Sequence, residues 1–199
     1  MIAIATAPDG FAAAVWLVVA LSLAGVAHVL WLKSPLSRRW SLPLDGGLTI
    51  RGRRVLGPNK TVRGLAMMPL GAMVAFFCIA ALRDAYPAWL ARGFWDLPPA
   101  TYALVGLACG FGFMLAELPN SFLKRQLDVS PGEEPRQAWL RPLCLVIDRV
   151  DSTVGVLVVL TIALPVSAAT WAWMLLLGPA SHAAFSAWMF HARLKARAL

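Results

Sequence analysis

Charged side chains are scarce in this chain of 199 residues: only 14% of the residues are Asp, Glu, Lys or Arg, whereas 59% are apolar. The mean hydropathy of +0.68 exceeds what the surface of a soluble globular protein tolerates. The composition therefore excludes a soluble globular domain and indicates an integral membrane protein.

Cysteine is also rare, and its three copies stand far apart at Cys78, Cys109 and Cys144. That spacing supports neither a zinc site nor a disulfide framework, so we interpret the three as small buried hydrophobic residues. No Lys or Arg precedes the first long apolar run. We therefore expect no cleavable signal peptide and expect that run to be retained.

Five stretches are long and apolar enough to cross a hydrocarbon core of roughly 30 Å, which takes about 20 helical residues each. They are residues 11–32, 64–82, 100–116, 153–169 and 171–191. The predicted fold class is an all-α integral membrane protein: a single domain over residues 1–199, built as a bundle of five transmembrane helices. Residues 33–63 and 117–152 are the predicted cytoplasmic loops that form the site.

The distribution of positive charge predicts the orientation. Lys and Arg number eight in residues 33–63, five in 117–152, three after residue 191, and two, Arg83 and Arg92, elsewhere. Positive charge is retained on the cytoplasmic side, so the N-terminus is predicted outside and the C-terminus in the cytoplasm of a multi-pass protein of the inner (cytoplasmic) membrane. The net charge of +8 is then a topology signal that also attracts membrane lipids, and no nucleic-acid partner is expected.

The first polar segment whose residues could bind a ligand covers residues 57–64. Asn59 is the expected N-cap, which places Lys60, Thr61 and Arg63 in the first helical turn. The N–H groups and the dipole at a helix N-terminus favour an anion, and Lys60 and Arg63 would flank the same phosphate. The alternative is that these cations are ordinary anchors that reach lipid phosphate at the membrane surface.

Two further segments combine acids with cations. Residues 117–125 follow the third span and include Glu117, Asn120, Ser121, Lys124 and Arg125, the mixture that a metal-bound phosphate requires. Residues 148–152 hold two carboxylates that repel one another unless a cation lies between them. The alternative is helix capping by Asp151 or Ser152, with Asp148 paired to Arg149 or Arg141.

Other polar residues are assigned structural roles. His28 and His182 lie inside predicted spans without an acidic neighbour in sequence, and we interpret them as core histidines. Asp45 is interpreted as one partner of a loop ion pair. The small residues Gly106, Gly110 and Gly112 predict close helix packing within one bundle, with a homodimer as the alternative.

Together the three segments resemble the integral-membrane CTP-dependent cytidylyltransferases, in particular the CDP-archaeol synthase branch related to CDP-diacylglycerol synthase. Residues 57–64 are similar to Gly-x-x-Lys-Thr-Trp-Arg-Gly, with Val62 in place of Trp. Residues 121–125 resemble Ser-x-x-Lys-Arg, and residues 148–152 resemble Asp-Arg-x-Asp-Ser. Two departures are Glu117, where the family has Asp, and residues 141–147, which replace a Pro-Gly-His-Gly-Gly stretch.

The resemblance implies a reaction of phospholipid biosynthesis in which a lipid phosphomonoester attacks the α-phosphorus of CTP, releases pyrophosphate and becomes a CDP-lipid. It implies catalytic roles for the cations Lys60, Arg63, Lys124 and Arg125. It further implies nucleotide binding by Asn59, Lys60, Thr61, Asn120 and Ser121. Its implied metal is Mg²⁺, with Glu117, Asp148 and Asp151 as ligands. Two alternatives are a CTP-dependent lipid kinase and a non-catalytic relative that binds lipid phosphate.

Overall fold

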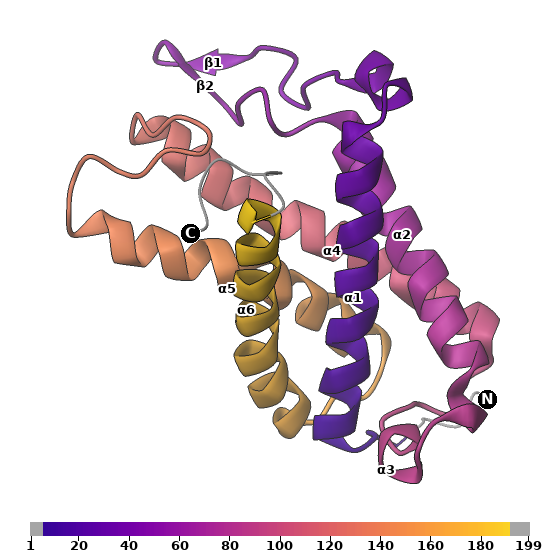
Figure 1. Ribbon diagram of the computed structural model, residues 1–199. Helices are drawn as coiled ribbons and strands as arrows, with labels where there is room; N and C mark the ends of the chain where they lie inside the picture. The colour runs from indigo at the N-terminus through magenta and orange to yellow at the C-terminus, as the bar shows by residue number, and fades with distance from the viewer. Residues whose placement is uncertain (1–5, 192–199) are drawn as a thin grey trace.

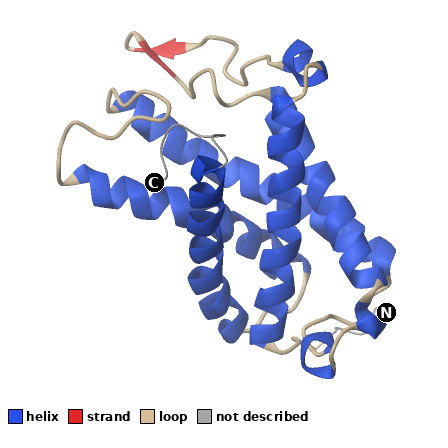
Figure 2. Cartoon of the chain, viewed as in Figure 1, coloured by secondary structure: helices blue, strands red, loops and turns tan. Residues whose placement is uncertain are grey.

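The computed structural model describes residues 6–191, and this part of the chain is almost entirely helical (Figures 1 and 2). Five long helices form the bundle: α1 (Gly10–Lys33), α2 (Val62–Ala81), α4 (Pro99–Gln126), α5 (Leu140–Ala163) and α6 (Ala168–His191). The predicted all-α membrane fold class is confirmed. Among the described residues, α1, α2 and α4 are long and apolar enough to cross a membrane. Spans by α5 and α6 remain predictions.

The connections carry short elements. Between α1 and α2 lie a 3-10 helix, η1 (Leu36–Trp40), and an antiparallel hairpin of β1 (Thr49–Ile50) and β2 (Arg53–Arg54). Between α2 and α4 lie η2 (Arg83–Ala85) and α3 (Ala88–Ala91). The hairpin and the α4–α5 connection lie toward one end of the bundle, and α3 lies at the other (Figure 1).

The expected loop 117–152 is largely helical, which corrects that expectation. Helix α4 continues to Gln126 and α5 begins at Leu140, so only residues 127–139 connect them. Leu, Lys, Arg, Glu and Gln all have high helix propensity, and a run of polar residues can extend a helix beyond the membrane as readily as end it. The second and third motifs therefore lie on two facing helices.

Close contacts between glycines and backbone fix how these helices pack. A Cβ added to Gly110 would lie 2.3 Å from Pro69 Cα of α2, and one added to Gly106 would lie 2.5 Å from the Ala72 carbonyl oxygen. A Cβ on Gly155 of α5 would lie 2.2 Å from the carbonyl oxygen of Gly112 of α4. The predicted close packing within one bundle is confirmed, and it brings α4 against both α2 and α5.

The orientation in the membrane remains a prediction. The loop 34–61, which carries six of the 18 Lys and Arg residues, and the α4–α5 connection, which carries Arg136, lie toward the same end of the bundle (Figure 1). The three basic residues after residue 191 lie outside the described residues.

Candidate functional site

The loop before α2 is organised around one buried carboxylate. Asp45, only 4% exposed, pairs with Arg54 and accepts hydrogen bonds from the backbone N–H groups of Gly47, Leu56 and Gly57 at 3.0–3.1 Å. The Arg54 guanidinium, followed by these N–H groups, holds the pKa of the Asp45 carboxyl well below its usual value. The predicted loop ion pair is confirmed, and it anchors the chain at the start of the first motif.

Helix α2 begins later than expected. Thr61, not Asn59, is its N-cap, and the Thr61 hydroxyl accepts a 3.4 Å hydrogen bond from the Gly64 N–H. Backbone hydrogen bonds from Leu44 to the Lys60 carbonyl and from Val62 to the Leu42 carbonyl keep this segment extended, so no helix can start at Asn59. The prediction of Asn59 as the N-cap was therefore wrong. Lys60 consequently follows a turn at residues 58–59 and lies two residues before the first residue of the helix.

Lys60 and Glu117 connect the first motif to the second. The Lys60 ammonium forms an ion pair with the Glu117 carboxylate, and the Lys60 side chain is only 13% exposed. The other Glu117 oxygen accepts a 3.0 Å hydrogen bond from the Ser152 hydroxyl of the third motif. All three motifs therefore meet at Glu117.

A second junction joins α4 to α5. The Asn120 amide donates to Asp148 at 2.6 Å and to Asp151 at 3.0 Å, and the Lys124 ammonium pairs with Asp148. Asn120 and Lys124 are four residues apart on α4, and Asp148 and Asp151 are three apart on α5, so each pair shares a helix face. Both aspartates lie inside α5, which rules out helix capping by Asp151 or by the Ser152 that follows it.

Two arginines of the predicted site have buried N–H groups without an acceptor among the described residues. They are Arg63 at Nε and Arg125 at Nε and Nη1. Arg63 makes one hydrogen bond, from Nη1 to the Ser37 hydroxyl at 3.1 Å. Gly57, at φ +96°, lets the loop approach Arg125, since a Cβ there would lie 3.4 Å from Arg125 Cδ. Buried donors without acceptors are costly unless a ligand supplies the acceptor.

Two cavities adjoin these groups. The first, of about 500 Å³, has an apolar part that includes Met68, Phe113 and Phe185, and a polar part that includes Thr61 and Arg63. The second, of about 590 Å³, is lined mainly by polar residues. The predicted site residues that line this cavity and not the first are Asn120, Ser121, Lys124, Arg125, Asp148 and Asp151. The wall that both cavities share consists of Asn59, Lys60, Glu117 and His182. The structure thus brings every predicted site residue to one of two adjoining cavities.

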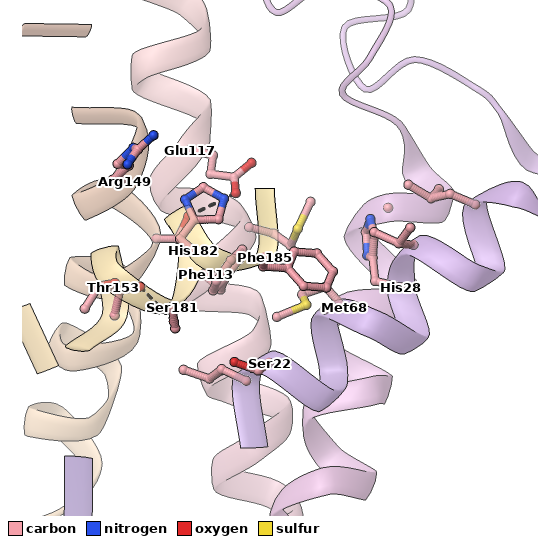
Figure 3. Close-up of a pocket in the computed structure, with 18 of the residues that line it drawn as sticks. Ser22, His28, Met68, Phe113, Glu117, Arg149, Thr153, Ser181, His182 and Phe185 are labelled. Atoms are coloured by element: carbon pink, nitrogen blue, oxygen red, sulfur yellow. Dashed lines mark hydrogen bonds between the residues drawn. The ribbon is translucent and has the colours of Figure 1, made fainter. Parts of the chain in front are cut away.

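The two histidines that were interpreted as core residues border a cavity. His28 of α1 and His182 of α6 both line the first cavity, and Figure 3 places them on facing walls, with Glu117 beside His182. Histidine in an apolar span is rare, which makes both residues candidates for the site. Neither has an acidic neighbour in sequence, but Glu117, which comes from another helix, lies beside His182 in space (Figure 3).

The carboxylate oxygens of the site fit a magnesium ion that is held jointly with a substrate. Within residues 6–191, no three acidic, His or Cys side chains are arranged to hold a metal by themselves. Asp148 and Asp151, however, both lie within 3.0 Å of a single nitrogen of Asn120, so their oxygens converge on one point. Mg²⁺ is commonly bound by one or two carboxylates plus substrate phosphates, and it prefers oxygen ligands. The two aspartates fit that requirement.

Comparison with known proteins identifies the family. The family model described as CarS-like, CDP-archaeol synthase, matches residues 39–196, a range that contains all three motifs. The chain belongs to the CDP-archaeol synthase family. The resemblance carried by the three motifs is thereby confirmed.

Individual members of the CDP-archaeol synthase family match parts of the chain. The CDP-archaeol synthase of Halorubrum lacusprofundi is 45% identical over 85 residues, which cover 42% of this chain and 44% of that protein. The CDP-archaeol synthase of Halobacterium salinarum is 32% identical over 123 residues, covering 62% of this chain and 61% of that protein. The chain therefore spans about half the length of these relatives.

A solved structure shares the fold. It was described as that of an intramembrane enzyme for the biosynthesis of archaeal membrane lipids. It superposes with a TM-score of 0.54 at 23% identity and covers 85% of this chain and 92% of its own. The arrangement of helices found here is thus that of a membrane-embedded fold.

Proposed function

We propose that this protein is a CTP-dependent cytidylyltransferase that converts a lipid phosphomonoester into a CDP-lipid and releases pyrophosphate. The observation that carries the proposal is the meeting of two chemically different cavities at one wall that contains Lys60 and Glu117. A reaction between a lipid and a nucleotide needs an apolar chamber and a polar chamber that adjoin at the reacting phosphates.

The polar cavity is proposed to bind CTP. Lys124 and Arg125 supply positive charge for the triphosphate, and the buried N–H groups of Arg125 still lack acceptors among the described residues. Asn59, Asn120 and Ser121 add amide and hydroxyl groups that can hydrogen-bond to phosphate, ribose or base. Phosphate oxygens are strong acceptors for such charged donors.

The first cavity is proposed to bind the lipid. Its apolar residues suit the chains, and Arg63 lies where the phosphate of such a lipid would meet the polar wall. Thr61, the N-cap of α2, lies beside Arg63, so the helix dipole adds positive potential at this point. Lys60 lines both cavities and is therefore proposed to contact the phosphate groups of both substrates.

Asp148 and Asp151 are proposed to hold Mg²⁺ together with oxygens of the triphosphate, and Glu117 remains the predicted third ligand. When bound, the ion would neutralise charge on the triphosphate. Lys124 pairs with Asp148, so the arrival of nucleotide would give this ammonium a phosphate in place of a carboxylate. The cations and acids of the site are thus positioned to exchange partners with an anionic substrate.

The chemistry needs positioning and charge more than proton transfer. A lipid phosphomonoester has a second pKa of about 6, so its attacking oxygen is already ionised near neutral pH. That oxygen forms a bond to the α-phosphorus of CTP while the bond from this phosphorus to the bridging oxygen of pyrophosphate breaks. Lys60, Arg63 and Arg125 stabilise the charge that develops on phosphate oxygens.

The test uses CTP labelled at two positions. Purified full-length protein is incubated with Mg²⁺, a dialkylglycerol phosphate and either [α-³²P]CTP or [γ-³²P]CTP. The proposal expects label in the lipid from the α position only, with the γ label in pyrophosphate. Label in the lipid from the γ position would instead identify a lipid kinase. No label from either position would identify a non-catalytic relative, and Lys60→Met serves as the inactive reference.

A further inference from the structure

His28 lies in the first cavity, between its apolar part and its cations. It lies on α1, five residues before the end of that helix at Lys33, or about 7.5 Å deeper along the helix axis. The apolar residues Met68 and Phe113 and the cations Lys60 and Arg63 line the same cavity. Figure 3 shows His28 facing into the space across which Glu117 and His182 lie.

The His28 ring packs against the start of α2. Its Cε1 atom lies 3.5 Å from where a Cβ on Gly64 would be, an ordinary van der Waals distance that places the imidazole against the first helical turn. Arg63, whose buried Nε also lacks an acceptor among the described residues, precedes Gly64 directly. The imidazole and the guanidinium therefore border the same part of the cavity.

The Nδ1 atom of His28 is shielded from solvent and has no hydrogen-bond partner among the described residues. A neutral imidazole carries one donor and one acceptor nitrogen, and leaving such a group unpaired in a buried place is costly. An unpaired buried group of this kind calls for a partner, and a ligand bound in the cavity can supply one.

From this placement we propose that His28 is a binding residue for the lipid substrate, forming a hydrogen bond with a glycerol oxygen that adjoins the phosphate. The inference rests on the proposed function and deepens it. Lys60 and Arg63 suit the phosphate itself because they are charged. A glycerol lipid carries weaker, neutral oxygen acceptors between its phosphate and its chains. His28 lies between the cations and the apolar wall of the cavity, so it is placed to meet these oxygens.

The test measures binding, so that it does not depend on turnover. Affinities of the full-length protein for a dialkylglycerol phosphate, for a long-chain monoalkyl phosphate that lacks glycerol, and for CTP are measured in detergent. The variants are His28→Phe, which removes the polar nitrogens, and His28→Gln, which keeps a donor and an acceptor. Leu30→Phe is the matched control, because Leu30 lies on the same helix, is 61% exposed and does not line the cavity.

We expect His28→Phe to weaken binding of the dialkylglycerol phosphate by about five- to tenfold, the usual effect of one hydrogen bond. Binding of monoalkyl phosphate and of CTP should stay within about twofold, and His28→Gln should recover part of the loss. Equal binding by wild type and His28→Phe would overturn the proposal. Equal weakening of both lipids would overturn the assignment to glycerol, and parallel loss of CTP binding in both variants would show a structural histidine.

The outcomes for the two proposals are distinct. If the wild type binds dialkylglycerol phosphate but transfers no label from CTP, the proposed function fails while the His28 comparison still decides the inference. If the wild type transfers label and His28→Phe has an unchanged KM for the lipid, the function stands and the inference is overturned. If the wild type binds neither lipid, both proposals are overturned.

Discussion

The Lys60 ammonium and the Glu117 carboxylate form an ion pair between residues 57 positions apart in the sequence. It ties the segment that enters α2 to the C-terminal half of α4, and Ser152 of α5 donates to the same carboxylate. Lys60 also lies in the wall shared by the two cavities. Glu117 therefore sets the position of a cation that lines the cavities of both proposed substrates.

The first prediction concerns Glu117. Glu117→Gln keeps an acceptor for Ser152 but removes the charge that holds Lys60, so CDP-lipid formation should fall by about 10- to 100-fold. Glu117→Asp should reduce the rate less, because the charge stays and only the reach changes. Rates measured against Mg²⁺ concentration separate the roles: a ligand loss raises the Mg²⁺ concentration needed for half-maximal rate. An unchanged Mg²⁺ dependence in Glu117→Gln would remove this residue from the metal ligands.

The second prediction concerns the paired aspartates. Asp148→Asn and Asp151→Asn should each reduce CDP-lipid formation by at least about 100-fold, because each removes a carboxylate ligand from a divalent ion. The thermal midpoint should change little, and Asp84→Asn is the control because its side chain is 97% exposed and lines neither cavity. Variants that lose stability but keep normal turnover would contradict the metal assignment.

The third prediction concerns the contact between α4 and α5. Gly155→Ala should destabilise the protein by about 1–3 kcal/mol, because its Cβ would lie 2.2 Å from the Gly112 carbonyl oxygen. Turnover should fall as well, since Asp151 lies one helical turn before Gly155. Thermal unfolding in detergent measures the effect. The control is Gly71→Ala, whose Cβ would meet nothing closer than 3.4 Å, and equal stability of the two variants would refute the packing argument.

The fourth prediction concerns the buried carboxylate of the loop. Asp45→Asn should increase protease cleavage within residues 34–61 at pH 7, because Arg54 and three N–H groups lose a charged acceptor. Because folding lowers the pKa of Asp45, its stabilising effect is present above the unfolded value of about 3.9 and is lost as the pH falls through the lower folded value. Cleavage of wild type and variant should therefore converge only in strong acid. A difference that disappears between pH 5 and 7 would argue against this role.

The sequence by itself determined the class of the protein and the chemistry available to it. An apolar composition with few charges excludes a soluble surface, so the helical membrane fold followed from elementary solvation. The three motifs contain acids, amides and cations at helical spacing, which predicted residues such as Lys60, Asp148 and Asp151 for the site. Asp45 was identified as an ion-pair partner because it is the sole acid in a strongly basic loop.

Local details of the backbone were less accessible to sequence reasoning. Asn59 and Thr61 are both good N-caps, and the choice of Thr61 depends on backbone hydrogen bonds with residues 42 and 44, outside any local window. The extension of α4 through Arg125 to Gln126 agrees with the high helix propensity of its residues, so the polarity that ends the apolar run did not mark the end of the helix. The end of an apolar run and the end of a helix are separate features of a sequence.

Only the tertiary structure decided which acid faces which cation and where the cavities lie. Glu117 pairs with Lys60, Lys124 pairs with Asp148, and His28 lines a cavity with Arg63, although each set comes from separate helices. Such pairings depend on the rotation and the axial shift of one helix against another. Contacts such as that of Gly155 with Gly112 fix this rotation and this axial shift. These contacts arise from the packing of segments that are distant in sequence, and no single motif encodes them.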